Sequence, residues 1–270
     1  MALDGTFLSL VKNELEKLVG GRVDKIHQPS KEEVLISIRT REGGFKLIFN
    51  TSAGTARVHI TKAEIENPKS PPMFCMLMRK HFGNGKLVAI RQDGFERILY
   101  FDFEAVNELG DLTTVTLVME IMGRHSNLIL INSEGKIIDS VKRVGQDMSS
   151  VRLVLPNLVY ETPPRVEKMG ITQFEREKFL EAINQYPTLF VSKAVMKTLE
   201  GISPVFAREA EFYACHGGES TVEDLTEDMT DRLCFFVKKT AIDIGSGNNT
   251  FTVLRDKDGL LKDFCFCEIS

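Results

Sequence analysis

The hydrophobic pattern of the N-terminal part begins helical and then becomes strand-like. Between residues 5 and 19, apolar side chains recur every three or four positions, which predicts an amphipathic helix. Asp4 stands where it can cap the first turn of that helix. Apolar and polar residues then alternate, which predicts an antiparallel meander with one buried face. Its strands are expected at 23–28, 34–39, 45–49 and 57–60.

A second set of strands follows a connector that contains Pro68, Pro71 and Pro72. Pro72 also suits the first turn of a helix, which the apolar spacing predicts at 73–82. Beyond this helix the pattern again favours strands, separated by turns that contain glycine. These strands are expected at 87–91, 96–103, 112–119, 128–132 and 137–144.

The pattern becomes helical at Ile171 and stays helical to about residue 244. A break at Leu199–Pro204 resembles the turn of a helix-hairpin-helix, whose backbone N–H groups can face a phosphate. Ser203 stands in place of the second glycine and the surroundings are acidic, so a plain corner between two helices is the simpler interpretation. A last hairpin is predicted from strands at 250–255 and 261–269.

These elements predict an α+β fold with an antiparallel β-rich lobe. We expect the lobe to occupy residues 1–165, with two antiparallel sheet regions before residue 156. A helical unit at 166–246, all-helical between 171 and 244, is expected to follow it. Residues 247–270 would return to the lobe as a hairpin. Because the chain stops on an apolar strand, we expect it to be part of a longer protein.

The charge of the chain is unevenly distributed, although its sum is only −4. Residues 1–156 hold 21 Lys and Arg against 19 Asp and Glu, whereas residues 157–249 hold 10 against 15. A nucleic-acid partner would therefore need a local basic patch in the first segment. No apolar run approaches the length of a membrane span, and no secretory signal precedes the first helix. The five cysteines, including Cys265 and Cys267, are expected to be free thiols in a reducing cytoplasm.

The stretch Glu120–Asn127 carries the densest candidate chemistry. It connects two predicted strands, yet it holds a carboxylate, a guanidinium, an imidazole, a hydroxyl and an amide. Arg and His can donate to a phosphate, and Asn can read a base edge or cap a turn. The alternative is an ordinary turn in which Glu120 pairs with Arg124 and the other side chains are solvated.

Several segments together resemble the N-terminal part of the NFACT proteins, known in bacteria as RqcH or FbpA. The matching segments are Asp4-Gly5, Lys25–Pro29, Pro72–Leu77, Glu96–Leu99 and Glu120–Asn127. The resemblance implies a β-rich lobe similar to the core of Fpg/Nei-like DNA glycosylases, followed by a helix-hairpin-helix segment. In that family a coiled coil and an RNA-binding domain come later in the chain.

The resemblance also implies a role in ribosome quality control. Family members bind tRNA and a large ribosomal subunit obstructed by peptidyl-tRNA, and they recruit alanyl-tRNA for untemplated alanine tailing of the stalled chain. The residues expected to bind tRNA or other RNA are Glu96, Arg97, Glu120, Arg124, His125 and Asn127. Glu96 stands where the family commonly has Asp, which makes Arg97 the firmer candidate. We expect Arg97, Arg124 and His125 to lie on one face, with Glu96 and Glu120 nearby.

The sequence contains no recognisable catalytic constellation beside these candidate residues. The chain has no Ser-His-Asp, Cys-His or H-E-x-x-H arrangement, and it lacks the N-terminal nucleophile of the glycosylases. We therefore expect a cytoplasmic, ribosome-associated protein that is not an enzyme and needs neither cofactor nor metal. The alternative function, also implied by the resemblance, is an adhesin that reaches the cell surface by a non-classical route and binds fibronectin or fibrinogen.

Overall fold

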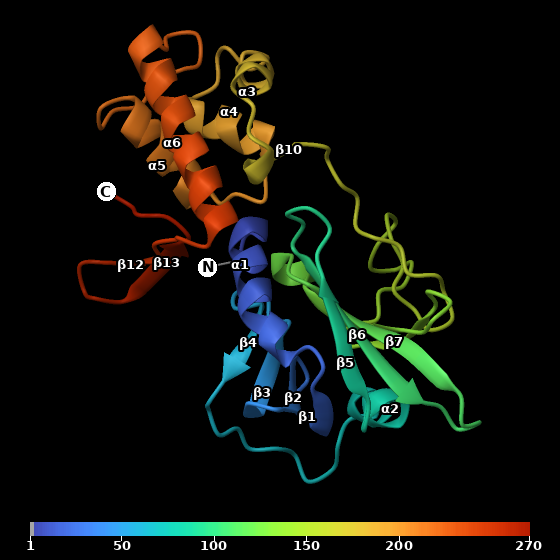
Figure 1. The fold of residues 1–270 in the computed structure, drawn as a ribbon. Coiled ribbons are helices and arrows are strands. Elements are labelled where there is room, and N and C mark those ends of the chain that lie inside the picture. Colours follow the sequence, from blue (N-terminus) through green and yellow to red (C-terminus); the bar gives the residue numbers. More distant parts are fainter. Residues whose placement is uncertain (1–2) are drawn as a thin grey trace.

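A single antiparallel sheet of nine strands forms the largest part of the molecule (Figure 1). The computed structural model describes residues 3–270. The strand order is β4-β3-β2-β1-β5-β6-β7-β8-β9. The strands span Arg22–Ser30 (β1), Glu33–Thr40 (β2), Gly43–Asn50 (β3), Arg57–Thr61 (β4), Lys86–Arg91 (β5), Ile98–Val106 (β6), Leu112–Glu120 (β7), Asn127–Ile131 (β8) and Ile137–Ser140 (β9).

Helices α1 (Gly5–Leu15) and α2 (Met73–Phe82) cover one face of this sheet, and the short helix η1 (Glu16–Leu18) continues α1. Asp4 caps α1 as predicted, because its carboxylate accepts the N–H of Phe7 at 2.6 Å. The main core lies between these helices and the strands, and in it Phe82 of α2 stacks on Phe103 of β6 at 4.3 Å. Strand alternation and helix periodicity thus bury the same core that the sequence pattern indicated.

The opposite face of β6–β9 is covered by a long segment without helices or strands. This segment spans residues 141–168. Val154 of this segment packs with Ile98, Val118, Ile129 and Ile137 of the sheet in a small second core. Backbone hydrogen bonds also join Val144 to Val154, and Ile137 to Leu158. The segment is therefore part of the lobe rather than a free linker.

The helical unit has its own core. It consists of η3 (Ile171–Gln173), α3 (Arg176–Ile183), α4 (Val191–Thr198), α5 (Pro204–Ala214) and α6 (Glu227–Ser246). Met169–Gly170 (β10) and Leu199–Glu200 (β11) form a short parallel pair. The prediction that residues 171–244 are all-helical is therefore wrong at Leu199–Glu200, where the chain extends before the turn at Gly201.

The C-terminal hairpin, β12 (Thr252–Arg255) and β13 (Leu261–Cys265), lies between the two larger parts (Figure 1). Phe264 packs edge-on against Phe7 of α1 at 4.9 Å. Phe266 stacks on Phe206 of α5 at 5.2 Å. Cys265 and Cys267 are free thiols with their Sγ atoms 3.6 Å apart.

The α+β class with an antiparallel β-rich lobe is confirmed, but two details differ from the prediction. The two expected sheet regions are one sheet, joined where Arg22 of β1 pairs with Lys86 of β5. Strand β6 begins at Ile98, so Glu96 and Arg97 precede it in a loop. Among the helices of residues 3–270, none is long and apolar enough to span a membrane.

Candidate functional site

The turn between β7 and β8 exposes two of the predicted residues. Helix η2 (Gly123–His125) forms its tip, and Gly123 has a left-handed φ of +57°. The hydroxyl of Ser126 accepts the N–H of Met122 at 2.8 Å and closes the turn. Arg124 and His125 are exposed, and Nε of Arg124 donates to Nε2 of His125 at 3.0 Å. Both side chains can therefore be reached by a ligand.

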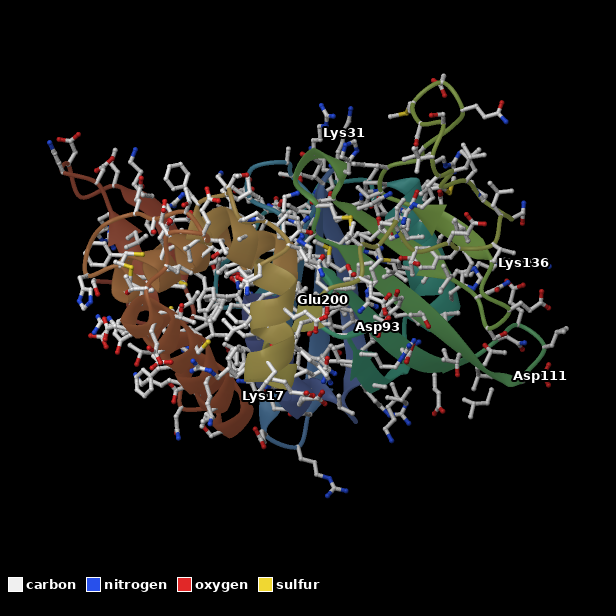
Figure 2. All side chains as sticks on the ribbon, turned by 90° about the horizontal axis from the view of Figure 1, so that it is seen from above. Lys17, Lys31, Asp93, Asp111, Lys136 and Glu200 are labelled. Atoms are coloured by element: carbon white, nitrogen blue, oxygen red, sulfur yellow. The ribbon has the colours of Figure 1, made fainter. Side chains whose placement is uncertain are left out.

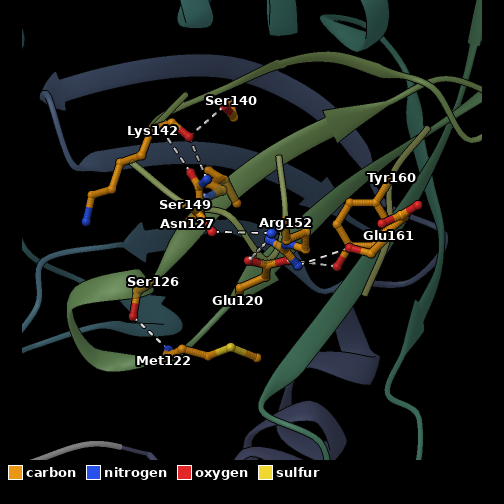
Figure 3. Close-up of polar contacts among 11 residues, drawn as sticks. Glu120, Met122, Ser126, Asn127, Ser140, Lys142, Ser149, Arg152, Tyr160 and Glu161 are labelled. Atoms are coloured by element: carbon orange, nitrogen blue, oxygen red, sulfur yellow. Dashed lines mark hydrogen bonds and ion pairs between the residues drawn. The ribbon is translucent and has the colours of Figure 1, made fainter. Parts of the chain in front are cut away.

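Glu120, at the base of the same turn, is an internal anchor (Figure 3). It is 1% exposed, and each of its carboxylate oxygens accepts from the guanidinium of Arg152 at 2.8 Å. The hydroxyl of Tyr160 donates to it at 2.8 Å. Burial alone would lower the pKa of Arg152, but Glu120 raises it above its ordinary value. The alternative pairing of Glu120 with Arg124 is wrong, because Glu120 ties residues 152–160 to the sheet.

Asn127 is also turned inward. It is 2% exposed, its amide donates to the carbonyl of Lys142 at 2.7 Å, and its Oδ1 accepts the N–H of Lys142 at 2.9 Å. Nζ of Lys142 donates in turn to the carbonyl of Thr51 at 2.7 Å and pairs with Glu32 at 2.9 Å. Asn127 thus fixes the backbone of Lys142, whose side chain contacts the two loops that contain Glu32 and Thr51, and the buried side chain of Asn127 is not open to a base edge.

Glu96 belongs to an acidic cluster organised by one arginine. Arg165 pairs with Asp93 at 2.9 Å, with Glu96 at 3.1 Å and with Glu200 at 3.0 Å. Asp93 and Glu200 lie near each other in Figure 2, although they come from the lobe and the helical unit. Burial raises the pKa of Glu96, and the charge of Glu200 adds to the rise while Arg165 opposes it. Glu96 therefore helps to join the two units.

Arg97 is exposed and forms no ion pair among residues 3–270. It lines a cavity of about 480 Å³ between the lobe and the helical unit, together with Asp4 and Lys168. Its carbonyl accepts the N–H of Ile121 at 2.8 Å, which places its backbone beside the turn that carries Arg124. Free guanidinium groups at such an edge are suited to bind phosphates.

The six predicted residues thus divide into two groups. Arg97, Arg124 and His125 are accessible at one end of the sheet, although no side-chain hydrogen bond joins Arg97 to the other two. Glu96, Glu120 and Asn127 are engaged with partners inside the fold. Sequence reasoning missed those partners, which are Arg152, Tyr160, Arg165, Lys142 and Glu200. Most of them lie in residues 141–168, where no hydrophobic period marks their position.

Asp4 lines the same cavity as Arg97 and is only 9% exposed. Burial raises its pKa from 3.8 to about 7, although the N–H of Phe7, the hydroxyl of Ser203 and the charge of Arg97 all oppose the rise. A carboxyl whose pKa is higher in the folded state keeps its proton there after the unfolded chain has lost it. Ionisation of Asp4 in the unfolded chain therefore lowers the stability of the fold as the pH rises from about 4 to about 7.

We expect Asp4→Asn to gain stability relative to the wild type over that pH range. Asn keeps an N-cap oxygen but carries no charge. The gain should reach on the order of a few kcal/mol above pH 7, because one pKa unit corresponds to about 1.4 kcal/mol. Urea unfolding of both proteins at several pH values between 4 and 8 measures it. A stability difference that stays constant over this range would contradict the buried, protonated state of Asp4.

The sequence has curated relatives that are much longer. It is 41% identical over 212 residues to the Rqc2 homolog RqcH of Bacillus subtilis, covering 78% of this chain and 37% of that protein. It is 32% identical over 121 residues to a ribosome quality control complex subunit NEMF homolog of Drosophila melanogaster, covering 45% of this chain and 12% of that protein. The chain therefore spans little more than a third of the bacterial relative.

The fold also matches solved structures. The N-terminal part of the fibronectin/fibrinogen-binding protein from Streptococcus suis superposes with a TM-score of 0.78 at 29% identity, covering 100% of this chain and 91% of that one. The family model for the NFACT N-terminal and middle domains matches residues 4–270. The chain therefore belongs to the NFACT family and contains its N-terminal and middle domains.

Proposed function

We propose that this chain is the N-terminal part of a cytoplasmic ribosome quality control factor. On this proposal the full protein binds tRNA and an obstructed large ribosomal subunit, and it recruits alanyl-tRNA for untemplated alanine tailing of the stalled chain. The names of the relatives from Bacillus and Drosophila support the process. We also propose that the chain is not an enzyme and needs no cofactor, because peptide-bond formation would belong to the ribosome.

The observation that carries the proposal is the exposure of Arg97, Arg124 and His125 at one end of the sheet. None of the three side chains is ion-paired with a carboxylate among residues 3–270, because Glu120 is paired with Arg152 and Glu96 with Arg165. An RNA backbone that approaches this end would meet open donors. Such contacts release counterions, so binding should weaken as the salt concentration rises.

We expect replacement of Arg97 by alanine in the full-length protein to weaken tRNA binding about tenfold, since a phosphate-paired Arg contributes on the order of 1–3 kcal/mol. The double variant Arg124→Ala, His125→Ala should also weaken tRNA binding. The dependence of affinity on salt should also become shallower, because fewer phosphates are neutralised. Filter binding of tRNA at several salt concentrations measures both effects.

Arg41→Ala is the matched control, because Arg41 is also exposed but lies in the β2–β3 turn. The opposite end of β2 is the one near the site, since Glu32 there pairs with Lys142, which is bonded to Asn127. All variants should melt near the wild-type temperature, since exposed substitutions typically change stability by less than about 0.5 kcal/mol. Wild-type affinity in a folded Arg97→Ala, Arg124→Ala, His125→Ala variant would remove these residues from the site.

An adhesin is the second candidate function, favoured by the name of the Streptococcus suis protein, which is called fibronectin/fibrinogen-binding. Sequencing the RNA that copurifies with the full-length protein from cells separates the two. Enriched tRNA and ribosomal RNA are expected from a quality control factor. RNA-free protein that binds fibronectin tightly would instead favour the adhesin.

A further inference from the structure

An apolar cavity of about 420 Å³ lies beside β4, and its lining includes none of the residues proposed to bind RNA. The first residues of the chain and α1 supply Leu3, Phe7 and Val11, β4 supplies Val58, and β13 supplies Phe264. The charged and titratable groups in its lining are Arg57 and His59, and its described lining contains no carboxylate. The cavity can therefore hold a large apolar side chain, with basic groups at its rim.

Strand β4 is an open edge of the sheet. It ends the strand order, and no backbone hydrogen bond joins its outer side to another segment of residues 3–270. The opposite edge strand, β9, is covered, because Ile137 exchanges backbone hydrogen bonds with residues 157 and 158. Edge strands are usually protected by charged side chains, Pro, a bulge or a covering segment. β4 carries one charged side chain, Arg57, but it contains no Pro and pairs with β3 in unbroken register.

The side chains of β4 alternate between two chemically different faces. Val58 is buried under α1, whereas Arg57 and His59 point to the other face and remain partly exposed. Nε of Arg57 donates to Nε2 of His59 at 3.2 Å, and its Nη1 donates to the carbonyl of Thr55 at 2.9 Å. Within the described chain no carboxylate pairs with Arg57.

An added strand beside β4 would have to match this alternation. Its side chains on the Val58 side would point toward the cavity, which extends to the strand edge because Arg57 and His59 also line it. Side chains on the other side would lie opposite Arg57 and His59, where acidic residues form favourable cross-strand pairs. The open backbone supplies affinity and the alternating side chains supply selectivity.

We propose that β4 and this cavity bind an extended peptide segment of a partner protein by strand addition. The segment places one large apolar side chain in the cavity and acidic residues at the two flanking positions. This inference does not depend on RNA binding, because none of the residues proposed to bind RNA lines this cavity.

The test uses the 270-residue chain and a short fluorescein-labelled peptide in which a central Phe is flanked by Glu at alternating positions. Fluorescence anisotropy should show saturable binding. Replacing the Phe of the peptide by Gly should weaken it about tenfold or more, and N-methylation of the peptide amides that face β4 should abolish it. Amide hydrogen exchange should slow in Arg57–Thr61 when the peptide is bound.

Charge reversal supplies the selective control. Arg57→Glu should weaken binding of the Glu peptide about tenfold and strengthen binding of the same peptide with Lys in place of Glu. Arg41→Glu, which changes the net charge equally, should alter neither. Equal binding of the Glu peptide to the wild type and Arg57→Glu would overturn the proposal, and so would equal binding of the Phe and Gly peptides. A chain that sediments as a dimer, with Arg57→Glu restoring the monomer, would assign the edge to a second copy and overturn it too.

Discussion

Replacing Arg152 by alanine is expected to lower the free energy of unfolding by about 3–5 kcal/mol. The change leaves the carboxylate of Glu120, only 1% exposed, with the hydroxyl of Tyr160 as its remaining side-chain partner. An unpaired buried charge costs far more than the net contribution of the pair itself. The segment around residue 152 would also lose its main polar link to the sheet. Equilibrium unfolding in urea measures the change.

Two further variants distinguish the effect of an unpaired buried charge from a nonspecific loss of stability. Lys178→Ala removes an ion pair with Glu175 whose side chains are both exposed, and it should cost less than about 1 kcal/mol. Arg152→Met combined with Glu120→Leu removes both charges and should be more stable than Arg152→Ala, since neither charge is left uncompensated. If the double variant is as unstable as Arg152→Ala, the loss comes from packing rather than from charge.

Gly5→Ala is expected to cost more than the roughly 1–3 kcal/mol of ordinary overpacking. A Cβ at Gly5 would lie 1.5 Å from the carbonyl oxygen of Phe95, which is backbone and cannot rotate away. The same junction contains the hydrogen bond from the N–H of Thr6 to the carbonyl of Gly201, at 2.8 Å. The substitution therefore forces apart α1, the loop before β6 and the turn after β11. Urea unfolding again measures the loss.

Gly44→Ala is the control for Gly5→Ala, because a Cβ added at Gly44 meets no atom within 4 Å. It should change stability by no more than about 0.5 kcal/mol. Similar unfolding midpoints for Gly5→Ala and Gly44→Ala would show that Gly5 and Phe95 are not in close contact in solution.

The sequence predicts those parts of the fold whose signals are local. Asp4 precedes an amphipathic repeat, so the start of α1 follows from capping chemistry alone. The strands alternate in hydrophobicity and are separated by glycine turns, so their number in the lobe could also be inferred. The joining of the two sets of strands into one sheet could not be inferred. The pair Arg22–Lys86 joins residues that are far apart in the chain, and it carries no periodic signal.

In the candidate site, too, the features with local signals can be predicted and those that depend on distant residues cannot. Arg97, Arg124 and His125 lie in short connections near strand ends, where exposed polar residues are expected. Whether Glu120 faces solvent or the interior depends on Arg152, which lies 32 residues later in an irregular segment. A single sequence gives no means to pair those two residues. The same is true of Arg165, whose three carboxylate partners come from two separate units.

The order of strands in the sheet also bears on how the chain folds. Every neighbouring pair of strands except β1 and β5 is consecutive in the sequence. Each half of the sheet can therefore grow by closing short loops, and closing a short loop costs little entropy. The one long closure, between β1 and β5, brings together two nearly complete hairpin arrays. The entropic cost of this closure is offset by burial of α1 and α2 against both halves.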